Sequence, residues 1–398
     1  MTPPASDIQP RHILILTDRD WTHPQGGGTG TNLYGQVARW LAWGHRVTVI
    51  AGSYPGAAAF QAPGPGLEIH RMGTRLTVFP KAFAAVRRGV GAGADVILEV
   101  VNGIAFFTPL WPSLRVPRVT LCHHVHQEHY VTELGLEGRI AAFWLERVPL
   151  RHLYRSSPFI TISNAARDDL VALGVPASQI HVAYLGVEPS QFCDAPKATR
   201  PTLLYLGRLK QYKRIEVVLD VLEAIPEAVL EIAGDGDHRP ALAAEIDRRG
   251  LADRVTMHGF VDEARKLELY ARAWVNLTAS SAEGWCLSVI EAAACGTPSA
   301  ALRVGGLSES IVDGQTGLLA DDPGELAAQV RELIASPDWR RRLGEAARAR
   351  ATGFTWEHTA AANLAVLDAA AQTSPRRLRE RVRGRLRMRA RAAPGSSA

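Results

Sequence analysis

The sequence contains only four cysteines in 398 residues. No two of them stand in the Cys-X-X-Cys spacing that zinc sites and dithiol redox centres need. We therefore interpret them as buried thiols of a protein that works in a reducing compartment. They are Cys122, Cys193, Cys286 and Cys295.

A secretory signal and a membrane-spanning run are also missing. The first ten residues, MTPPASDIQP, lack the basic start and the apolar run of a signal peptide. No stretch of about 18 uncharged apolar residues occurs in the chain. These absences predict a cytoplasmic protein, which a basic tail could hold peripherally at the inner face of the plasma membrane.

Positive charge is concentrated at the C-terminus. The formal charge is +5, yet residues 375–398 hold nine arginines against Glu380, a local +8, so the rest of the chain carries −3. Arginine recurs at nearly every second position, which would distribute it around a helix and disfavours an amphipathic membrane helix. We interpret residues 374–398 as a disordered tail. Attraction of residues 376–391 to anionic lipid is the second interpretation, and nucleic-acid binding is not expected.

Short apolar runs alternate with longer amphipathic stretches along the chain. Continuous apolar runs are typical of strands covered on both faces, and this rhythm predicts α/β folding with parallel sheets. The runs of the first half are 13–16, 46–52, 95–100, 118–122 and 159–163, and those of the second half are 202–207, 228–234, 254–259 and 274–280.

A polar stretch with two prolines, residues 194–201, interrupts the rhythm near the middle. A chain of this length suits two domains. We predict an N-terminal Rossmann-like domain over 11–193 and a C-terminal one over 200–353. Ligands of open parallel sheets gather outside the carboxyl ends of the strands, so the residues that follow each run are the candidates for a site.

A glycine-rich stretch, WTHPQGGGTGTNLYG, follows the first strand. A dinucleotide fingerprint would place a third glycine where Leu33 stands, and would end the second strand with an acid in place of Ser53. A Rossmann oxidoreductase is therefore disfavoured. The loop Gly26, Gly27 and Gly28 could still bring backbone N–H groups close to an anion or a sugar hydroxyl at a helix N-terminus, although a flexible connector is an equal alternative.

Cations gather after the first strand of the second half, in the stretch Arg208-Leu-Lys-Gln-Tyr-Lys213-Arg214. Cations at a helix N-terminus oppose the helix dipole, so a bound anion would relieve the arrangement. A guanidinium grips phosphate oxygens with two donors, and an ammonium adds a point charge. Arg208 and Lys213 are therefore candidates for binding a diphosphate, and a solvated helix start is the alternative.

Two carboxylates, Glu283 and Glu291, bracket a small and apolar segment after the run 274–280. Buried without partners they would be costly, whereas at a ligand site they could accept from vicinal hydroxyls of a sugar or ribose. We expect Glu283 in a loop and Glu291 two turns into a helix from about Trp285. The backbone amides of Gly284, Trp285, Cys286 and Leu287 would then point toward a phosphate.

The C-terminal half contains an ordered set of motifs over about 120 residues. The set consists of Gly207-Arg208-Leu209 with Lys213, Gly234-Asp235-Gly236, Glu283-Gly284 through Glu291-Ala292, Cys295-Gly296-Thr297-Pro298, Gly305-Gly306 with Glu309, and Asp313-Gly314 with Thr316 to Leu319. Together these motifs resemble the donor half of retaining GT-B glycosyltransferases of family four. In the first half the glycine loop, Gly44 to Val47 and Gly186-Val187 agree less tightly, with Leu185 where the family usually has Asn.

The resemblance implies a GT-B fold, in which two Rossmann-like domains with parallel sheets face each other across a cleft. The last helix, 356–373, would cross back to the N-terminal, acceptor-binding domain. The C-terminal domain would bind a UDP- or GDP-linked sugar. The implied activity is transfer of that sugar, a hexose by expectation, to an acceptor hydroxyl in glycan or glycoconjugate synthesis.

The resemblance also assigns roles to single residues. Arg208 and Lys213 would hold the diphosphate, Glu291 the ribose and Glu283 the sugar, while the backbone of Gly259, Phe260 and Val261 would line the base. Fixed cations and helix amides would stabilise the leaving diphosphate without a metal. No cofactor is expected, because the nucleotide-sugar is a substrate, and retention of configuration rests on the resemblance alone.

A histidine-rich stretch, CHHVHQEHY, follows the strand 118–122. Its spacing contains neither His-Glu-X-X-His nor a cysteine partner at metal distance, so a zinc site is disfavoured. By the resemblance His123, and after it His124, would face the donor sugar and bind it or take part in proton transfer. The strings Asp18-Arg-Asp20 and Asp235-Gly-Asp237 are interpreted as loop or cap residues and not as a metal site.

Two other functions remain open from the sequence. A non-catalytic module could bind a nucleotide-sugar without turnover, and a GT-B epimerase could act on the sugar nucleotide without an acceptor. The acceptor could be a lipid, a polysaccharide or a small metabolite, and the oligomeric state is not indicated.

Overall fold

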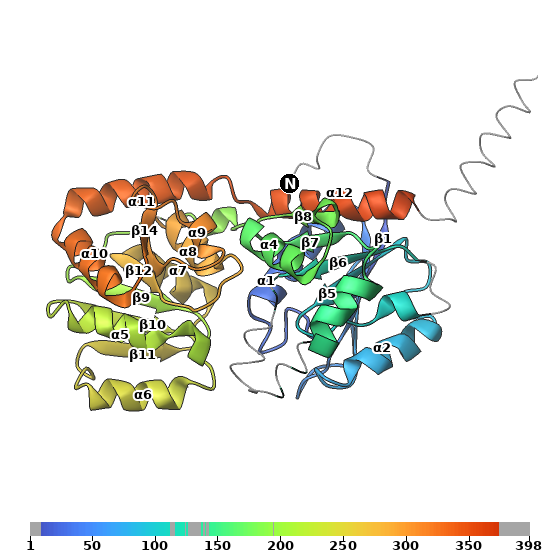
Figure 1. Cartoon of the computed structure of the whole chain (residues 1–398), viewed down its shortest axis with the longest axis horizontal. Helices are drawn as coiled ribbons and strands as arrows, with labels where there is room; N and C mark the ends of the chain where they lie inside the picture. The colour runs from blue at the N-terminus through green and yellow to red at the C-terminus, as the bar shows by residue number, and fades with distance from the viewer. Residues whose placement is uncertain are drawn as a thin grey trace, which may run out of the picture. The chain divides into compact units, whose positions relative to one another are not determined.

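Two mainly parallel sheets organise the structure, and each contains the apolar runs of one half of the chain (Figure 1). The computed structural model describes residues 9–111, 116–123, 125, 137, 140, 143–193 and 195–373. Unit 1 comprises the described residues of Met1–Thr161, Leu170–His181 and Ala360–Ala398, and unit 2 comprises Ile162–Asp169 with the described residues of Val182–Thr359. The predicted α/β architecture with parallel sheets is confirmed.

Unit 1 contains an eight-stranded sheet in the order β3-β4-β2-β1-β5-β6-β7-β8. Its strands are β1 (His12–Leu16), β2 (Arg46–Ala51), β3 (Phe60–Gly64), β4 (Leu67–Arg71), β5 (Val96–Val101), β6 (Arg118–Cys122), β7 (Phe159–Thr161) and β8 (Ile180–Val182). The edge strand β3 is exposed and pairs antiparallel with β4. The sequence did not predict β3, β4 or β8, because none of them is a continuous apolar run.

The helices around this sheet pack through buried apolar side chains. Helix α2 packs Val78, Ala82 and Ala85 against Leu14, Leu16, Ile50 and Ile97 of the sheet. The helical segments are α1 (Gly27–Ala42), α2 (Val78–Arg87), η1 (Thr108–Leu110), η2 (Phe143–Arg147), η3 (Pro149–Leu153), α4 (Asn164–Leu173) and η4 (Ala177–Gln179). The segments η2 and η3 are short π-helical turns that follow each other closely in the chain.

Unit 2 contains a six-stranded, wholly parallel sheet in the order β11-β10-β9-β12-β13-β14. Its strands are β9 (Thr202–Leu206), β10 (Val229–Ala233), β11 (Val255–Gly259), β12 (Val275–Thr278), β13 (Ser299–Leu302) and β14 (Gly317–Ala320). Its helical segments are η5 (Pro189–Gln191), η6 (Gln211–Lys213), α5 (Ile215–Glu223), α6 (Arg239–Arg248), α7 (Glu263–Arg272), α8 (Leu287–Ala294), α9 (Leu307–Ser310), α10 (Pro323–Ala335), α11 (Pro337–Ala351) and α12 (Trp356–Gln372), the last of which continues into unit 1.

Both faces of the unit 2 sheet are covered, which explains why its strands are continuously apolar. Leu203 and Tyr205 of β9 lie in one cluster with buried residues of α5, α6 and α10. Leu204, between them in sequence, lies in another cluster with residues of α7 and α8. Since parallel strands end at the same edge, the loops after β9, β10, β11 and β12 come together at one side of this unit.

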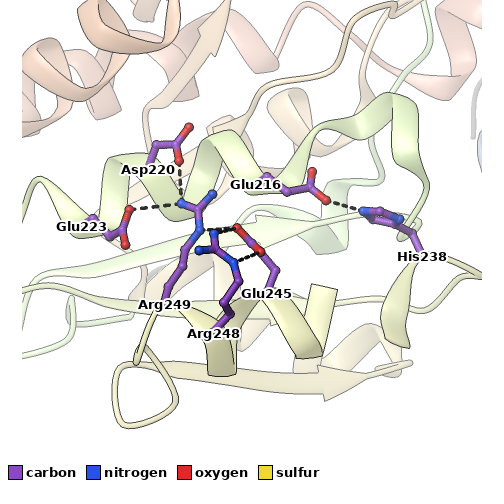
Figure 2. Close-up of polar contacts among 7 residues, drawn as sticks. All are labelled: Glu216, Asp220, Glu223, His238, Glu245, Arg248 and Arg249. Carbon is purple, nitrogen blue, oxygen red and sulfur yellow. Dashed lines mark hydrogen bonds and ion pairs between the residues drawn. The ribbon is translucent and has the colours of Figure 1, made fainter. Parts of the chain in front are cut away.

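A charged network joins α5 to α6 (Figure 2). The Arg249 guanidinium pairs with Asp220 at 2.6 Å and Glu223 at 3.1 Å on α5, and with Glu245 of α6 at 2.6 Å. His238, at the start of α6, pairs with Glu216 in the first turn of α5. Side-chain hydrogen bonds from Arg248 and Arg249 lower the pKa of Glu245 to about 2. The network holds together two helices that begin at the carboxyl edge of the sheet.

Glycines let the loops at this edge pack backbone against backbone. A Cβ on Gly234, after β10, would lie 1.9 Å from the carbonyl oxygen of Gly207, after β9, and its φ of +130° is unfavourable for any side chain. A Cβ on Gly306 would lie 2.1 Å from the carbonyl oxygen of Gly284. These contacts explain physically why glycine stands at two of the motif positions.

We predict that Gly234→Ala lowers the free energy of unfolding by roughly 3 kcal/mol, because overpacking adds to backbone strain. Gly353→Ala is the matched control, since its Cβ would meet only an ordinary contact of 3.4 Å at a residue without positive φ. Urea unfolding of both variants measures the difference. Equal stability of the two variants would contradict the close approach seen at Gly234.

Candidate donor site in unit 2

The predicted cation Lys213 lies against the predicted carboxylate Glu283. Lys213 ends η6 after β9, and its Nζ donates to Glu283 Oε1 in the loop after β12. The two side chains are only 14% and 11% exposed. Burial alone would lower the pKa of Lys213, but the Glu283 charge raises it above its ordinary value. The lysine is therefore a permanent cation, and its counter-ion is supplied by the chain itself.

Tyr212 connects the remaining predicted cation to this pair. The Arg208 Nη2 donates to the Tyr212 hydroxyl at 3.2 Å, and the Lys213 Nζ lies 5.0 Å from the centre of the Tyr212 ring. The carbonyl of Tyr212 accepts from the backbone N–H of Ser281 at 2.8 Å, which ties the loop after β9 to the loop after β12. Arg208 itself is exposed at the protein surface. The structure thus brings Arg208, Lys213 and Glu283 together.

Glu283 is held by a further partner that the sequence did not single out. The hydroxyl of Ser280 donates to Glu283 Oε1 at 2.8 Å. The backbone carbonyl of Glu283 accepts from the Gly306 N–H at 2.8 Å, because the absent side chain of Gly306 permits this approach. The carboxylate position is therefore set both by its own loop and by the loop before α9.

Glu291 lies in a different polar cluster from Lys213. Helix α8 begins at Leu287, two residues later than predicted, so Glu291 stands one turn into it and is 7% exposed. Its Oε1 accepts from Lys266 Nζ at 2.8 Å and Gln191 Nε2 at 3.3 Å, and its Oε2 accepts from the Tyr270 hydroxyl at 3.0 Å. Burial alone would lower the pKa of Lys266, and the Glu291 charge raises it. The sequence missed these three partners because they come from η5 and α7.

Trp285 and Cys286 differ from each other in their surroundings. The Trp285 ring is 1% exposed and packs on Tyr184 at 4.6 Å and on Phe354 at 5.0 Å between ring centres. Cys286 precedes α8 with a φ of +72°, which turns the chain into the helix. Any contact of Trp285 with a ligand would therefore come from its backbone.

The interpretation of all four cysteines as buried is wrong for Cys193 and Cys286, which are partly exposed.

An exposed aromatic ring, that of Phe260, follows the end of β11. Gly259 has a φ of +68°, and its carbonyl accepts from the Gly234 N–H at 2.7 Å. Phe260 follows with 86% of its surface exposed, while Val261 packs against the cluster around α7 and α8. Gly259, Phe260 and Val261 thus lie at the same sheet edge as Arg208, with the ring of Phe260 accessible.

Glu309, a member of the motif set, caps a helix. It accepts from the backbone N–H of Asn164 at 2.9 Å and that of Ala165 at 2.7 Å, at the start of α4. The Tyr184 hydroxyl also donates to it at 2.9 Å. Burial would raise the pKa of Glu309, and these hydrogen bonds lower it. Its role in this structure is to fix the N-terminus of α4 to α9.

In unit 1 the predicted residues that the structure describes lie around the start of α1. Gly26 precedes α1, and Gly27 and Gly28 form its first turn, so two of the three glycines are helical and not loop residues as predicted. His123 is 5% exposed, and its Nε2 lies 2.7 Å from Asn32 Nδ2 of α1. Because the amide nitrogen can only donate, His123 Nε2 is the acceptor. His124 lies outside the described residues.

A chain of side-chain amides connects His123 to the last helix. Gln36 Nε2 donates to Asn32 Oδ1 at 2.6 Å, and Asn363 Nδ2 of α12 donates to Gln36 Oε1. All are buried, so the orientation of each amide is fixed by its neighbour. The sequence gave no reason to single out Asn32 or Gln36 as functional residues, because both lie in a stretch with the amphipathic pattern of an ordinary helix.

The two Asp-X-Asp strings differ in burial. Asp20 and Arg71 form a fully buried ion pair at 2.6 Å, and Asp18 pairs with Arg75 at 3.0 Å. Asp237 is exposed and pairs with Lys210 at 2.5 Å. Across the described ranges, no three His, Cys, Asp or Glu side chains gather closely enough to form a metal-binding group.

We predict that Lys213 and Glu283 are strongly coupled. Lys213→Ala and Glu283→Ala should each lower the free energy of unfolding by roughly 3 kcal/mol, because each leaves a buried charge without its counter-ion. The double variant should lose less than the sum by about 1–3 kcal/mol. The exposed pair Lys210 and Asp237 is the control, with a coupling below about 1 kcal/mol. Urea unfolding of the single and double variants of both pairs measures the two coupling energies. Equal coupling energies would contradict the burial of the Lys213–Glu283 pair.

Comparison of the chain with known proteins identifies its family. Residues 190–350 match the family model described as glycosyl transferases group 1, and residues 26–191 match that of glycosyltransferase family 4. A D-inositol 3-phosphate glycosyltransferase of Xylanimonas cellulosilytica is 33% identical over 56% of this chain and 58% of its own length. The D-inositol 3-phosphate glycosyltransferase of Thermobifida fusca is 30% identical over 63% of this chain and 64% of its own length. The chain thus spans about three fifths of these two relatives.

Other relatives match over greater lengths at lower identity. A phosphatidylinositol N-acetylglucosaminyltransferase subunit of Arabidopsis thaliana is 23% identical over 94% of this chain and 86% of its own. A solved sucrose-phosphate synthase of Thermosynechococcus elongatus superposes with a TM-score of 0.79 at 22% identity, covering 90% and 98% of the two chains. HepE of Anabaena, solved with UDP and glucose, superposes with a TM-score of 0.70 at 18% identity, covering 90% of this chain and 100% of its own. The two family matches lie side by side over residues 26–350, and the chain belongs to the GT-B glycosyltransferases of group 1.

Proposed function

We propose that this protein transfers a sugar from a UDP- or GDP-linked donor to an acceptor hydroxyl, with retention of anomeric configuration and without a metal. The observation that carries the proposal is the buried Lys213–Glu283 pair beside the exposed Arg208, at the carboxyl edge of the unit 2 sheet. This edge belongs to the part of the chain that matches the group 1 family. Retention rests on the family resemblance.

Fixed positive groups would stabilise the departing diphosphate. Breaking the bond between sugar C1 and the phosphate oxygen builds negative charge on the leaving group. Lys213 stays charged at neutral pH because Glu283 raises its pKa, and Arg208 offers an exposed guanidinium. The backbone amides of residues 284–287, in the segment that leads into α8, would add partial positive charge. These groups can supply the charge compensation that a metal supplies in other phosphate sites.

Glu291 is suited to a ribose only through its remaining acceptor capacity. A carboxylate has about four lone-pair positions, and Lys266, Gln191 and Tyr270 occupy three of them among the described residues. One position on Oε2 is left for a ribose hydroxyl. The three partners would hold the carboxylate ready for that contact, which limits the ordering needed on binding.

The exposed Phe260 ring favours a nucleoside nearby. Every base has a π-face that can stack on an aromatic side chain, and this ring lies next to Gly259 at the end of β11. The neighbour HepE of Anabaena has been solved with UDP-glucose as well as UDP. Both facts support a nucleotide-sugar donor and leave the choice of base to experiment.

Unit 1 would supply the acceptor side. The family resemblance gives His123 a role in sugar binding or proton transfer, and the chain of amides through Asn32, Gln36 and Asn363 would hold its ring in one orientation. The first turn of α1, with Gly26 to Gly28, is the accompanying candidate for binding an acceptor oxygen. A lipid, a polysaccharide and a small metabolite remain the acceptor classes to be tested.

The first test is a thermal-shift screen across UDP, GDP, ADP and their sugars. A nucleotide that binds the native state raises the melting temperature, by an amount that grows with its concentration. Incubation of the stabilising donor with candidate acceptors should then release free nucleoside diphosphate. Binding without release would indicate a non-catalytic module, and a product of unchanged mass would indicate an epimerase.

We predict that Glu291→Ala and Lys213→Ala lower the rate of nucleoside diphosphate release by about 100-fold or more, because each would remove a polar contact to the donor. Asp235→Ala, in an exposed loop at the same edge, should change the rate by less than about 3-fold. The rates are measured with the donor that the thermal-shift screen identifies. Similar losses in all three variants would show that the site has been misassigned.

The arginine-rich tail, which lies outside the described residues, is proposed to bind anionic membrane surfaces through residues 376–391. Each arginine near an anionic surface contributes about 1 kcal/mol. Within the part of the chain that the structure describes, no helix combines the length and apolarity needed to cross a bilayer.

We predict that deletion of residues 375–398 abolishes co-sedimentation with phosphatidylserine vesicles and leaves turnover in solution unchanged. Vesicles of neutral phosphatidylcholine are the control and should bind neither form. Equal sedimentation of the truncated and the full-length protein with phosphatidylserine would rule the tail out as the membrane anchor.

A further inference from the structure

Two cysteines of unit 2 lie with their sulfurs in contact. Cys193, which follows η5, and Cys295, which follows α8, have Sγ atoms 2.7 Å apart, although 102 residues separate them in sequence. A disulfide has an S–S length of about 2.05 Å, so an approach of roughly 0.7 Å would form the bond. Both are free thiols in this structure.

The two thiols differ in access. Cys193 is partly exposed, and Cys295 is 5% exposed with its Sγ 3.3 Å from the carbonyl oxygen of Gln191. Burial raises the pKa of the Cys295 thiol, while the nearby charge of Lys197 acts in the opposite direction. Lys197 is anchored by a hydrogen bond of 2.5 Å to Thr297 Oγ1. A soluble oxidant would therefore meet Cys193 first, and Cys295 is placed as the resolving thiol.

We propose that Cys193 and Cys295 form a reversible disulfide by exchange with small-molecule disulfides. The Cys193 thiolate attacks one sulfur of the oxidant, releases the first small thiolate and leaves a mixed disulfide on Cys193. The Cys295 thiolate then attacks the Cys193 sulfur and expels the second small thiolate. The two protons lost by the cysteines end on the two small thiols. The cysteines are oxidised and the small disulfide is reduced by the same two electrons.

The Cys193–Cys295 disulfide would connect the segment before β9 to the end of α8. Gln191, two residues before Cys193, donates to Glu291 at 3.3 Å and to Glu263 at 2.9 Å. Glu291 stands four residues before Cys295 on α8. The disulfide would therefore add a covalent link beside the Gln191–Glu291 hydrogen bond, between the same two segments. The exchange chemistry of the two thiols does not depend on the proposed transfer reaction.

The test uses the full-length protein, incubated with oxidised glutathione and then with reduced glutathione. After oxidation, alkylation and proteolysis, mass spectrometry should find the Cys193 and Cys295 peptides joined, two hydrogens lighter than the sum of the reduced peptides. Reduced glutathione should restore both alkylated peptides. The oxidised form should melt at a higher temperature, because the cross-link constrains a loop of about 100 residues in the unfolded chain.

Variants separate this pair from the other thiols. Cys193→Ser and Cys295→Ser should each abolish both the cross-link and the rise in melting temperature, whereas Cys122→Ala should retain them. Exchange should accelerate as the pH rises from 7 to 9, because the thiolate is the attacking species. A stable glutathione adduct on Cys193 without the cross-link, or a cross-link that involves another cysteine, would overturn the proposal.

Discussion

The site in unit 2 depends on keeping charged side chains partly buried at one edge of a parallel sheet. Removing an ion from water is costly, so each buried charge here has an opposite charge or several hydrogen-bond donors against it. Lys213 has Glu283, and Glu291 has Lys266 together with Tyr270 and Gln191. Within each pair the opposite charges neutralise each other, and the pairing fixes the positions of groups that a phosphate or a hydroxyl could use.

Backbone packing makes this arrangement possible. The loops after β9 and β10 touch through Gly207 and Gly234, and the loop before α9 touches the Glu283 loop through Gly306. Any side chain at Gly234 or Gly306 would separate two loops that carry charged groups. Placement of the Lys213–Glu283 pair thus depends on residues without side chains as well as on the ions themselves.

Unit 1 places its histidine by a different means. His123 is oriented by a neutral amide, and that amide is oriented by Gln36 and Asn363 in turn. The network orients the ring through uncharged amides, the first of which donates to the Nε2 atom of His123. Helix α12 therefore contributes to the position of a residue that follows β6, more than 200 positions earlier in the chain.

The sequence alone determined the two α/β halves and the cations and carboxylates of the C-terminal half. Continuous apolar runs follow from sheets covered on both faces, and the glycine and charge motifs stand at fixed positions after those runs. It could not determine that Glu291 is bound by Lys266 and Tyr270, that Trp285 is buried against Tyr184, or that Cys193 meets Cys295. Those contacts join segments 20 to 100 residues apart, and only the packing of helices on the sheet decides which side chains meet.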